Sequence, residues 1–153
     1  MKPSERLKAL NIDLPTVAAP VANYVPAVRV GALVYTSGQL PFQDKVLFCT
    51  GKVPTDTDVE RAAHGARIAM LNAVAAAAAA AGSVDRITRA IRVGVFVNSA
   101  PGFTAQPKVA NGASDVLVEI FGDAGRHARA AVGVAELPLD AAVEVELLVE
   151  TAQ

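Results

Sequence analysis

The residues best suited to chemistry lie near the carboxyl end, in GRHARAAVGVAELPLDAAVEVE (125–146). Arg129 opens an apolar run there, and only small or apolar residues follow it as far as Ala135. A planar guanidinium binds a carboxylate through two parallel hydrogen bonds, and the flanking alanines leave room for a ligand. The other interpretation is an arginine at a strand end that lies in solvent or caps a helix. Arg129 is therefore either a carboxylate clamp or a structural residue.

The glutamates that follow sit on one side of an alternating pattern. In AAVEVELLVE (141–150) a period of two places Glu144, Glu146 and Glu150 on one strand face and the valines on the other. The plain interpretation is that the valines point inward and the glutamates point into water. A partly shielded glutamate near an arginine could instead hold a water molecule and transfer protons. The pattern alone does not distinguish Glu144 from its neighbours.

Three further residues are candidates for ligand contact. Gly38, in TSGQ (36–39), offers backbone donors at what is otherwise a strand end followed by turn residues. Asn111 interrupts an apolar helix, where an unbonded amide has a cost, so it is either a satisfied structural residue or a ligand contact. Tyr24 lies among prolines and is either a lid or a packing residue.

The elements that must position these residues follow one order. Residues 125–146 read as two short strands joined by a turn, and VRVGALVYTSGQLP (28–41) as a hairpin that turns at Gly31 and Ala32. A helix is predicted from about Asp58 to Ala81, with Thr57 or Asp56 as its cap and Gly82 as its end. Further elements are a strand over 87–97, a helix from 107 or 108 to 121, and a possible edge strand over 46–53 that carries the single cysteine.

The order β-β-(β)-α-β-α-β-β predicts an α+β fold, in which two helices cover one face of a mostly antiparallel sheet. The first 25 residues are expected to form an extended segment with a short helix, capped by Ser4 and ending at Leu10. Pro15, Pro20 and Pro26 keep the rest of this segment irregular. On strand 87–97, Ile87, Arg89, Ile91, Val93, Val95 and Val97 are expected to share one face.

Composition bounds the class of protein. With 153 residues the chain is most simply one domain. It is 52% hydrophobic but only 5% aromatic, and so many small side chains favour further burial against copies of itself. A net charge of −1 gives no basic field for nucleic acid. One cysteine and two histidines make a metal site unexpected. The charged amino-terminal segment and an apolar run too short to span a bilayer predict a cytoplasmic protein without a membrane partner.

Several motifs together resemble the YjgF/RidA family of reactive intermediate (imine/enamine) deaminases, once labelled endoribonuclease L-PSP, and in particular a longer-chain branch of it. The most specific is an arginine, a run that ends in Leu-Pro, and a glutamate fifteen residues after the arginine. The matching segments are Tyr24, TSGQLP (36–41), LNAVAAAAAAAG (71–82), VGVFV (93–97), VAN (109–111) and ARAAVGVAELPLDAAVEVE (128–146).

The resemblance implies a chorismate-mutase-like fold and a homotrimer with ligand clefts between subunits. It assigns substrate binding to Arg129 and the holding of the attacking water to Glu144, and it puts Tyr24, Gly38 and Asn111 around the cleft. The implied reaction is the hydrolysis of reactive 2-imino or enamino acids to 2-keto acids and ammonia, without a cofactor. The implied partner is a small metabolite that bears a carboxylate.

Two positions depart from the family pattern. His127 stands where proline is typical, and Ala130-Ala131 stands where a Ser-Cys pair often follows the arginine. These departures put the choice of substrate in question. They leave a second function open, a non-catalytic module that binds small carboxylates. The ribonuclease reading has only the old family label behind it.

Overall fold

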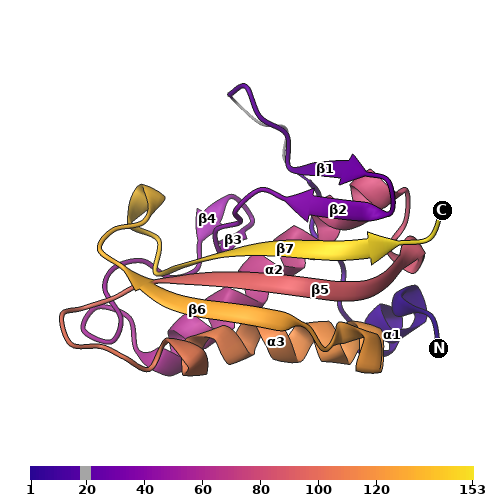
Figure 1. Ribbon diagram of the computed structural model, residues 1–153. Helices are drawn as coiled ribbons and strands as arrows, with labels where there is room; N and C mark the ends of the chain where they lie inside the picture. Colours follow the sequence, from indigo (N-terminus) through magenta and orange to yellow (C-terminus); the bar gives the residue numbers. More distant parts are fainter. Residues whose placement is uncertain (18–21) are drawn as a thin grey trace.

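One mixed sheet and two long helices carry the structure, a computed structural model that describes residues 1–17 and 22–153 (Figure 1). The strands are β1 (Ala27–Val30), β2 (Leu33–Thr36), β3 (Phe42–Gln43), β4 (Val46–Leu47), β5 (Ile87–Asn98), β6 (Ala128–Val134) and β7 (Val143–Thr151). The helices are α1 (Pro3–Ala9), α2 (Val59–Ala81) and α3 (Gln106–Phe121), with 3₁₀ turns at Val84–Arg86, Gly122–Gly125 and Pro138–Asp140.

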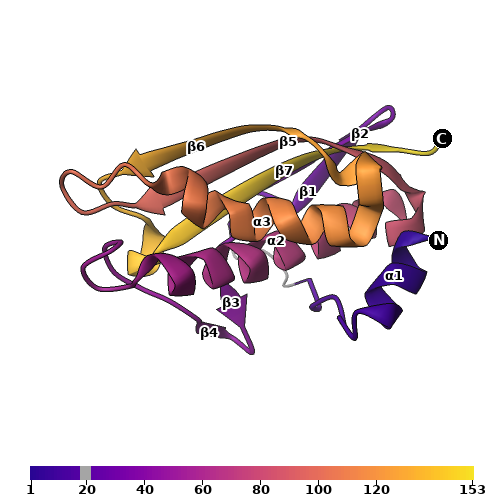
Figure 2. The same cartoon turned by 90° about the horizontal axis from the view of Figure 1, so that it is seen from below.

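The main sheet has the strand order β1-β2-β7-β5-β6. Every pairing in it is antiparallel except that of β5 with β6. Helices α2 and α3 lie on one face of this sheet and leave the other face uncovered in the single chain (Figure 2). The predicted α+β class, with two helices on one face of a mostly antiparallel sheet, is confirmed.

The expected hairpin over 125–146 is wrong. Strand β6 runs parallel to β5, and β7 pairs with the opposite edge of β5, so β5 lies between them. The reason is the crossover from β5 through α3 to β6, because a helix that returns across the sheet face delivers the next strand parallel to the first. Residues 135–142 then cross the end of β5 instead of forming a tight turn.

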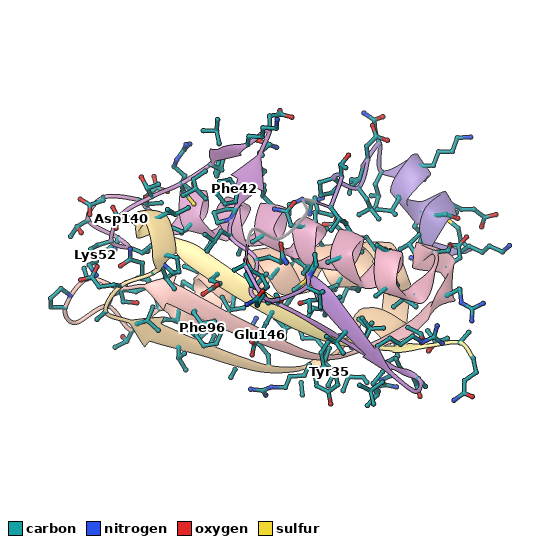
Figure 3. The ribbon with its side chains drawn as sticks, turned by 90° about the horizontal axis from the view of Figure 1, so that it is seen from above. Tyr35, Phe42, Lys52, Phe96, Asp140 and Glu146 are labelled. Carbon is teal, nitrogen blue, oxygen red and sulfur yellow. The ribbon has the colours of Figure 1, made fainter. Side chains whose placement is uncertain are left out.

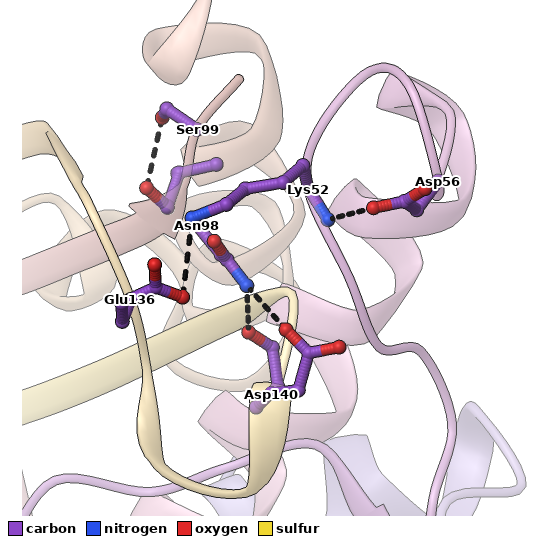
Figure 4. A network of polar contacts seen from close by, with 8 residues as sticks. Lys52, Asp56, Asn98, Ser99, Glu136 and Asp140 are labelled. Atoms are coloured by element: carbon purple, nitrogen blue, oxygen red, sulfur yellow. Dashed lines mark hydrogen bonds and ion pairs between the residues drawn. The ribbon is translucent and has the colours of Figure 1, made fainter. Parts of the chain in front are cut away.

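A polar network holds this crossing segment in place (Figure 4). The buried amide of Asn98, at the end of β5, donates to Asp140 Oδ1 at 3.2 Å and to the carbonyl oxygen of Ala141 at 3.1 Å. Lys52 forms an ion pair with Glu136 at 3.4 Å, and its backbone N–H donates to Asp56 Oδ2 at 2.9 Å. Because β7 begins directly after this segment, the network also fixes where the glutamates of β7 start.

The bounds of the long helices follow from their ends. Asp58, and not the expected Thr57 or Asp56, caps α2, since its Oδ1 accepts from the backbone N–H of Arg61 at 2.7 Å. Gly82 ends α2 as predicted, with a φ of 97° that favours glycine. Pro107 lies in the first turn of α3, and Gly122 follows its last residue, also as predicted.

The two helices cross closely because small residues line the contact. A Cβ atom added at Gly112 of α3 would collide with the carbonyl oxygen of Ala63 in α2. A bidentate pair of Arg67 with Glu119, at 3.0 and 2.9 Å, ties the helices together at their outer side. The core beneath them is built largely from alanine and valine, with Met70, Leu117 and Ile120 among its largest fully buried side chains.

Two expected strand features are corrected. Residues 46–53 add no edge strand to the main sheet; β4 pairs only with β3, in a separate small hairpin, and Cys49 lies after it, buried against Gly65. The expected faces of β5 hold only from Val93 on. Irregularities in the pairing of β5 with β7 shift the alternation, so that Ala90 is buried while Arg89 and Arg92 are exposed.

The amino-terminal segment contains the expected short helix with a different cap. Ser4 lies inside α1, and Lys2 is the cap residue, whose backbone N–H donates to Glu5 at 2.8 Å. The Ser4 hydroxyl and backbone N–H instead donate to Asp85 at 2.7 and 2.8 Å, which lowers the pKa of that carboxyl. Pro20 lies outside the described residues. Among the helices described, none is long and apolar enough to cross a bilayer.

Candidate functional site

Arg129 is the centre of a polar group on the helix-covered side of the sheet. It is the second residue of β6 and pairs with Val93, which is fully buried beneath the helices. Its Nη1 donates to Asn111 Oδ1 at 2.9 Å and to Ser114 Oγ at 3.1 Å, both on α3. Ser114 also contacts His127. We call Asn111, Ser114, His127 and Arg129 the arginine cluster.

Local periodicity brings the arginine cluster together. Asn111 and Ser114 are three residues apart on α3 and so lie on one helix face. His127 and Arg129 are two residues apart at the start of β6 and so point to one side. Because β6 is the edge strand and α3 precedes it directly, the two pairs face each other across a short gap.

The guanidinium keeps three of its five N–H donors available. Both Nη1 protons have acceptors in Asn111 and Ser114, whereas Nε and Nη2 have no partner within residues 1–17 and 22–153. The Arg129 side chain is exposed. The Nε–Nη2 edge of a guanidinium presents two parallel N–H groups, the geometry that matches a carboxylate. The arginine cluster therefore offers one bidentate edge to a small anion.

Glu144 and Gly38 form a second group, which we call the glutamate cluster. A Cβ atom added at Gly38 would lie 2.5 Å from Glu144 Oε1, so the carboxylate rests directly on the glycine backbone. Glu144 is half-buried, and burial raises the pKa of its carboxyl, with a smaller contribution from the nearby charge of Glu146. A carboxylate with a raised pKa is better suited to take up a proton near neutral pH.

The other glutamates of β7 are placed differently. Glu146 is exposed and lies over Gly94 of β5, where an added Cβ atom would lie 2.8 Å from its Oε1. Glu150 is exposed near the end of the strand. Of the three, only Glu144 is both shielded and next to the backbone of residues 36–39.

Tyr24 is connected to the glutamate cluster through the residue that follows it. Its ring is 57% exposed. The next residue, Val25, accepts a hydrogen bond through its carbonyl oxygen from the Ser37 hydroxyl at 2.6 Å, and Ser37 precedes Gly38. The exposed ring is thus attached beside the glutamate cluster and packs into no core.

The two clusters lie on opposite faces of the sheet in one chain. Paired residues share a face, and Glu144 pairs with Phe96 on the uncovered face, while Arg129 pairs with Val93 on the covered one. The expected hairpin would have put Glu144 on the strand next to that of Arg129. This is wrong, because β5 lies between β6 and β7. The structure brings Arg129 to Asn111 and Gly38 to Glu144, but it does not bring the two pairs to each other.

The uncovered face around the glutamate cluster carries apolar side chains. Tyr35, Phe96 and Glu146 can be followed there in Figure 3. Val28 and Tyr35 are each 49% exposed and Val132 is 45% exposed, while Phe96 and Leu148 are half-buried. Large apolar side chains that stay exposed on one sheet face favour the interpretation of that face as an interaction surface.

Ser114 is a functional candidate that the sequence did not single out, and His127 stood out only as a departure from the family pattern. Both ring nitrogens of His127 are hydrogen-bonded, Nδ1 to the carbonyl oxygen of Gly125 at 2.7 Å and Nε2 to Ser114 Oγ at 2.9 Å. The spacings Asn-x-x-Ser and His-x-Arg were the available signals. Their meaning depends on the docking of α3 against β6.

Cys49 belongs to neither cluster. Burial raises the pKa of its thiol to about 11, so the side chain is a protonated packing residue. Among the described residues, no three histidine, cysteine, aspartate or glutamate side chains are grouped closely enough to hold a metal ion.

Residues 4–151 match the family described as "YjgF/chorismate_mutase-like, putative endoribonuclease". Protein TCP17 of Trypanosoma cruzi is 48% identical over 145 residues, which cover 94% of this chain and 91% of that protein. A 2-iminobutanoate/2-iminopropanoate deaminase of Dermatophagoides farinae is 30% identical over 138 residues, with 90% and 93% covered. The crystal structure of Atu1372 from Agrobacterium tumefaciens, a protein of unknown function, is similar with a TM-score of 0.90 and 42% identity, and 98% and 92% of the chains are covered.

Proposed function

The chain belongs to the YjgF/chorismate-mutase-like family, and on this premise we propose that it hydrolyses reactive 2-imino or enamino acids to 2-keto acids and ammonia. The observation that carries the proposal is the arginine cluster, in which Arg129 is held by Nη1 and presents its Nε–Nη2 edge. The relative named as a 2-iminobutanoate/2-iminopropanoate deaminase acts, by that name, on small acids with an imine beside the carboxylate.

Arg129 binds the substrate carboxylate in this proposal. The bidentate edge fixes the plane of the carboxylate and, with it, the position of the adjacent imine carbon. Ala131, the next residue of β6 on the same sheet face as Arg129, has a small side chain and leaves the approach open. Because a 2-imino acid is already electrophilic, holding it in one orientation next to a water molecule is enough to accelerate hydrolysis.

Glu144 holds and deprotonates that water molecule. As the water oxygen bonds to the imine carbon, one water proton passes to Glu144 and the C=N electron pair moves to nitrogen. Glu144 then returns the proton to nitrogen, which gives a carbinolamine. The hydroxyl proton of the carbinolamine next passes through Glu144 to the nitrogen as the C–N bond breaks, so that ammonia leaves and the carbonyl of the 2-keto acid forms. The raised pKa of Glu144 suits both the acceptance and the return of the proton.

The reaction requires a second copy of the chain, because the two clusters lie on opposite faces of one sheet. We propose a homotrimer in which the uncovered sheet face of one subunit, with Glu144, Gly38 and Tyr24, packs beside the arginine cluster of the next. The exposed apolar residues of that face support burial against a like chain.

A binding module for small carboxylates is the alternative. It would use Arg129 in the same way, without turnover. The observation that favours it is Ala130-Ala131, which supplies no polar side chain next to the arginine. Endoribonuclease activity, which the family description also mentions, has little electrostatic support in a chain of net charge −1.

Ammonia release from freshly generated imino acids tests the proposal. Wild-type protein is expected to accelerate imine decay, Arg129→Ala to lose both acceleration and keto-acid binding, and Glu144→Gln to lose acceleration alone. Glu146→Gln, from the same strand face, is the matched control and is expected to stay active. Binding without acceleration in the wild type would establish the binding module instead.

A further inference from the structure

A chain of hydrogen bonds runs behind Arg129, away from its exposed edge. Arg129 Nη1 contacts Ser114 Oγ at 3.1 Å, Ser114 Oγ contacts His127 Nε2 at 2.9 Å, and His127 Nδ1 contacts the carbonyl oxygen of Gly125 at 2.7 Å. Ser114 and His127 are both partly buried, whereas Arg129 is exposed. The chain thus leads from an exposed charge back to a fixed backbone atom in the turn before β6.

For the neutral imidazole of His127, the donors and acceptors in this series of hydrogen bonds have one consistent assignment. The carbonyl oxygen of Gly125 can only accept, so Nδ1 of His127 carries the proton. In the neutral imidazole Nε2 is then an acceptor, and the Ser114 hydroxyl donates to it. The Ser114 oxygen keeps a lone pair that accepts from Arg129 Nη1. Every link therefore has a donor and an acceptor, and the direction of the chain is fixed from arginine to backbone.

We propose that Ser114 and His127 are positioning residues that fix the orientation of the Arg129 guanidinium toward the substrate carboxylate. The inference rests on the proposed function, in which Arg129 binds that carboxylate. Asn111 takes one Nη1 proton and Ser114 takes the other, so the guanidinium plane is defined by two acceptors. Only the Nε–Nη2 edge is then presented, and a ligand does not have to select it from several rotamers.

His127 anchors the series of hydrogen bonds behind Arg129. A serine hydroxyl alone rotates freely and can turn its proton or its lone pair toward Arg129. The acceptor at His127 Nε2 holds the hydroxyl proton on the far side, so the lone pair faces the arginine. His127 thereby fixes which side of the Ser114 hydroxyl meets Arg129.

Substitutions at His127 distinguish the contribution of Nδ1 from that of Nε2. His127→Asn places its amide near the Nδ1 position, so it keeps the bond to Gly125 and loses the acceptor for Ser114. His127→Gln places an acceptor near the Nε2 position. Ser114→Ala removes the link, and Ser114→Thr keeps the hydroxyl. His64→Asn is the matched control, since His64 packs edge-on against the ring of Phe48 and takes no part in the hydrogen bonds between Arg129, Ser114, His127 and Gly125.

The first readout is binding of 2-ketobutyrate by titration calorimetry, with KM and kcat for the imine. We expect Ser114→Ala and His127→Asn each to weaken binding about three- to tenfold, the range of one hydrogen bond, with a higher KM and an unchanged kcat. The double variant is expected to be no weaker than either single variant, because both break one chain. Ser114→Thr and His127→Gln are expected to bind closer to the wild type. Additive losses, or unchanged binding in both single variants, would overturn the proposal.

The second readout needs no ligand. In ¹⁵N NMR spectra the His127 ring is expected to report the tautomer protonated at Nδ1, and the Arg129 Nη1 protons to exchange slowly in the wild type and faster in Ser114→Ala. If the wild-type protein neither binds the keto acid nor accelerates imine decay, the proposed function fails, while these signals still decide the positioning. An Nε2-protonated ring, or Arg129 exchange that is the same in Ser114→Ala, would overturn it.

Discussion

Glu144 is a candidate catalytic carboxylate that is also partly buried. These two properties oppose each other, because burial disfavours the charged form of a carboxyl group. Burial and the charge of Glu146 raise its pKa above the ordinary value of 4.5. The folded state therefore binds this proton more tightly than the unfolded state does. By linkage, the stability of the protein falls as the pH rises from about 4.5 through the raised pKa, and the loss persists at neutral pH.

Glu144→Gln is accordingly expected to raise the thermal midpoint at pH 7, although it lowers turnover. The gain is expected to vanish near pH 3, where the wild-type carboxyl is protonated in both states. Thermal unfolding of both proteins between pH 3 and pH 8 measures the difference. Glu150→Gln, at an exposed position of the same strand, is the control and should show no such trend. A midpoint for Glu144→Gln below that of the wild type at pH 7 would contradict the assignment.

The Arg129→Lys variant tests, at the same scale, whether the planar guanidinium itself, and not only its charge, binds the carboxylate. The lysine ammonium keeps the charge. It lacks the planar fork that lets Arg129 hydrogen-bond to α3 on one side and bind a carboxylate through two parallel hydrogen bonds on the other. We expect keto-acid binding to weaken about ten- to a hundredfold, which corresponds to about 1.5–3 kcal/mol for a hydrogen bond to a charged group. Calorimetric titration measures the change, with Arg126→Lys as the control, because Arg126 is exposed and forms an ion pair with Asp123 at 3.5 Å. Normal binding by Arg129→Lys would rule out the clamp.

Part of this residue-level picture could be predicted from the sequence. Alternation along 141–150 correctly put the valines inward and the glutamates on the other face, since a half-buried strand imposes that period. It could not separate Glu144 from Glu146, because the difference comes from Gly38, which is remote in sequence. The roles of Ser114 and His127 depend likewise on how α3 docks beside β6.

At the scale of elements, the local signals placed the ends of the long helices to within about two residues, whereas the predicted long-range pairing was wrong. The hairpin of β1 and β2 and the ends of α2 and α3 follow from turn and cap residues within a few positions. The partner of β6 is set instead by the crossover through α3, which no local pattern encodes. The mistaken pairing put Arg129 and Glu144 on neighbouring strands, whereas the fold places them on opposite faces.

At the crossing of α2 and α3, helix propensity and close packing predict opposite effects of the Gly112→Ala substitution on stability. Helix propensity alone predicts that Gly112→Ala stabilises α3 by about 1 kcal/mol. The collision of an added Cβ atom with the Ala63 carbonyl predicts destabilisation instead, by about 1–3 kcal/mol or more. Chemical denaturation measures the free energy of unfolding. Asp115→Ala, an exposed position on the same helix, serves as the control for propensity. A more stable Gly112→Ala variant would mean that the helices are not in close contact.

At the scale of the whole molecule, the single chain covers only one of the two faces of its main sheet. One face is covered by helices, and the other exposes Val28, Tyr35 and Val132 beside the glutamate cluster. A core rich in alanine and valine buries little area per residue, so covering this face with another copy adds substantially to stability. The proposed trimer would complete the sheet packing and the site in one step.

Mixing two inactive variants tests this arrangement most directly. If each site takes Arg129 from one subunit and Glu144 from the next, Arg129→Ala and Glu144→Gln subunits complement each other in hybrid trimers. With equal amounts assembled at random, about half of the sites keep each residue, so about a quarter of the wild-type activity should return. Sedimentation equilibrium should first show three times the chain mass of 15.7 kDa. Differently tagged Arg129→Ala subunits mixed with each other are the control and should stay inactive. Hybrids that form and remain inactive would place both residues in one chain's site and overturn the shared cleft, because only a site built across subunits can be restored by mixing.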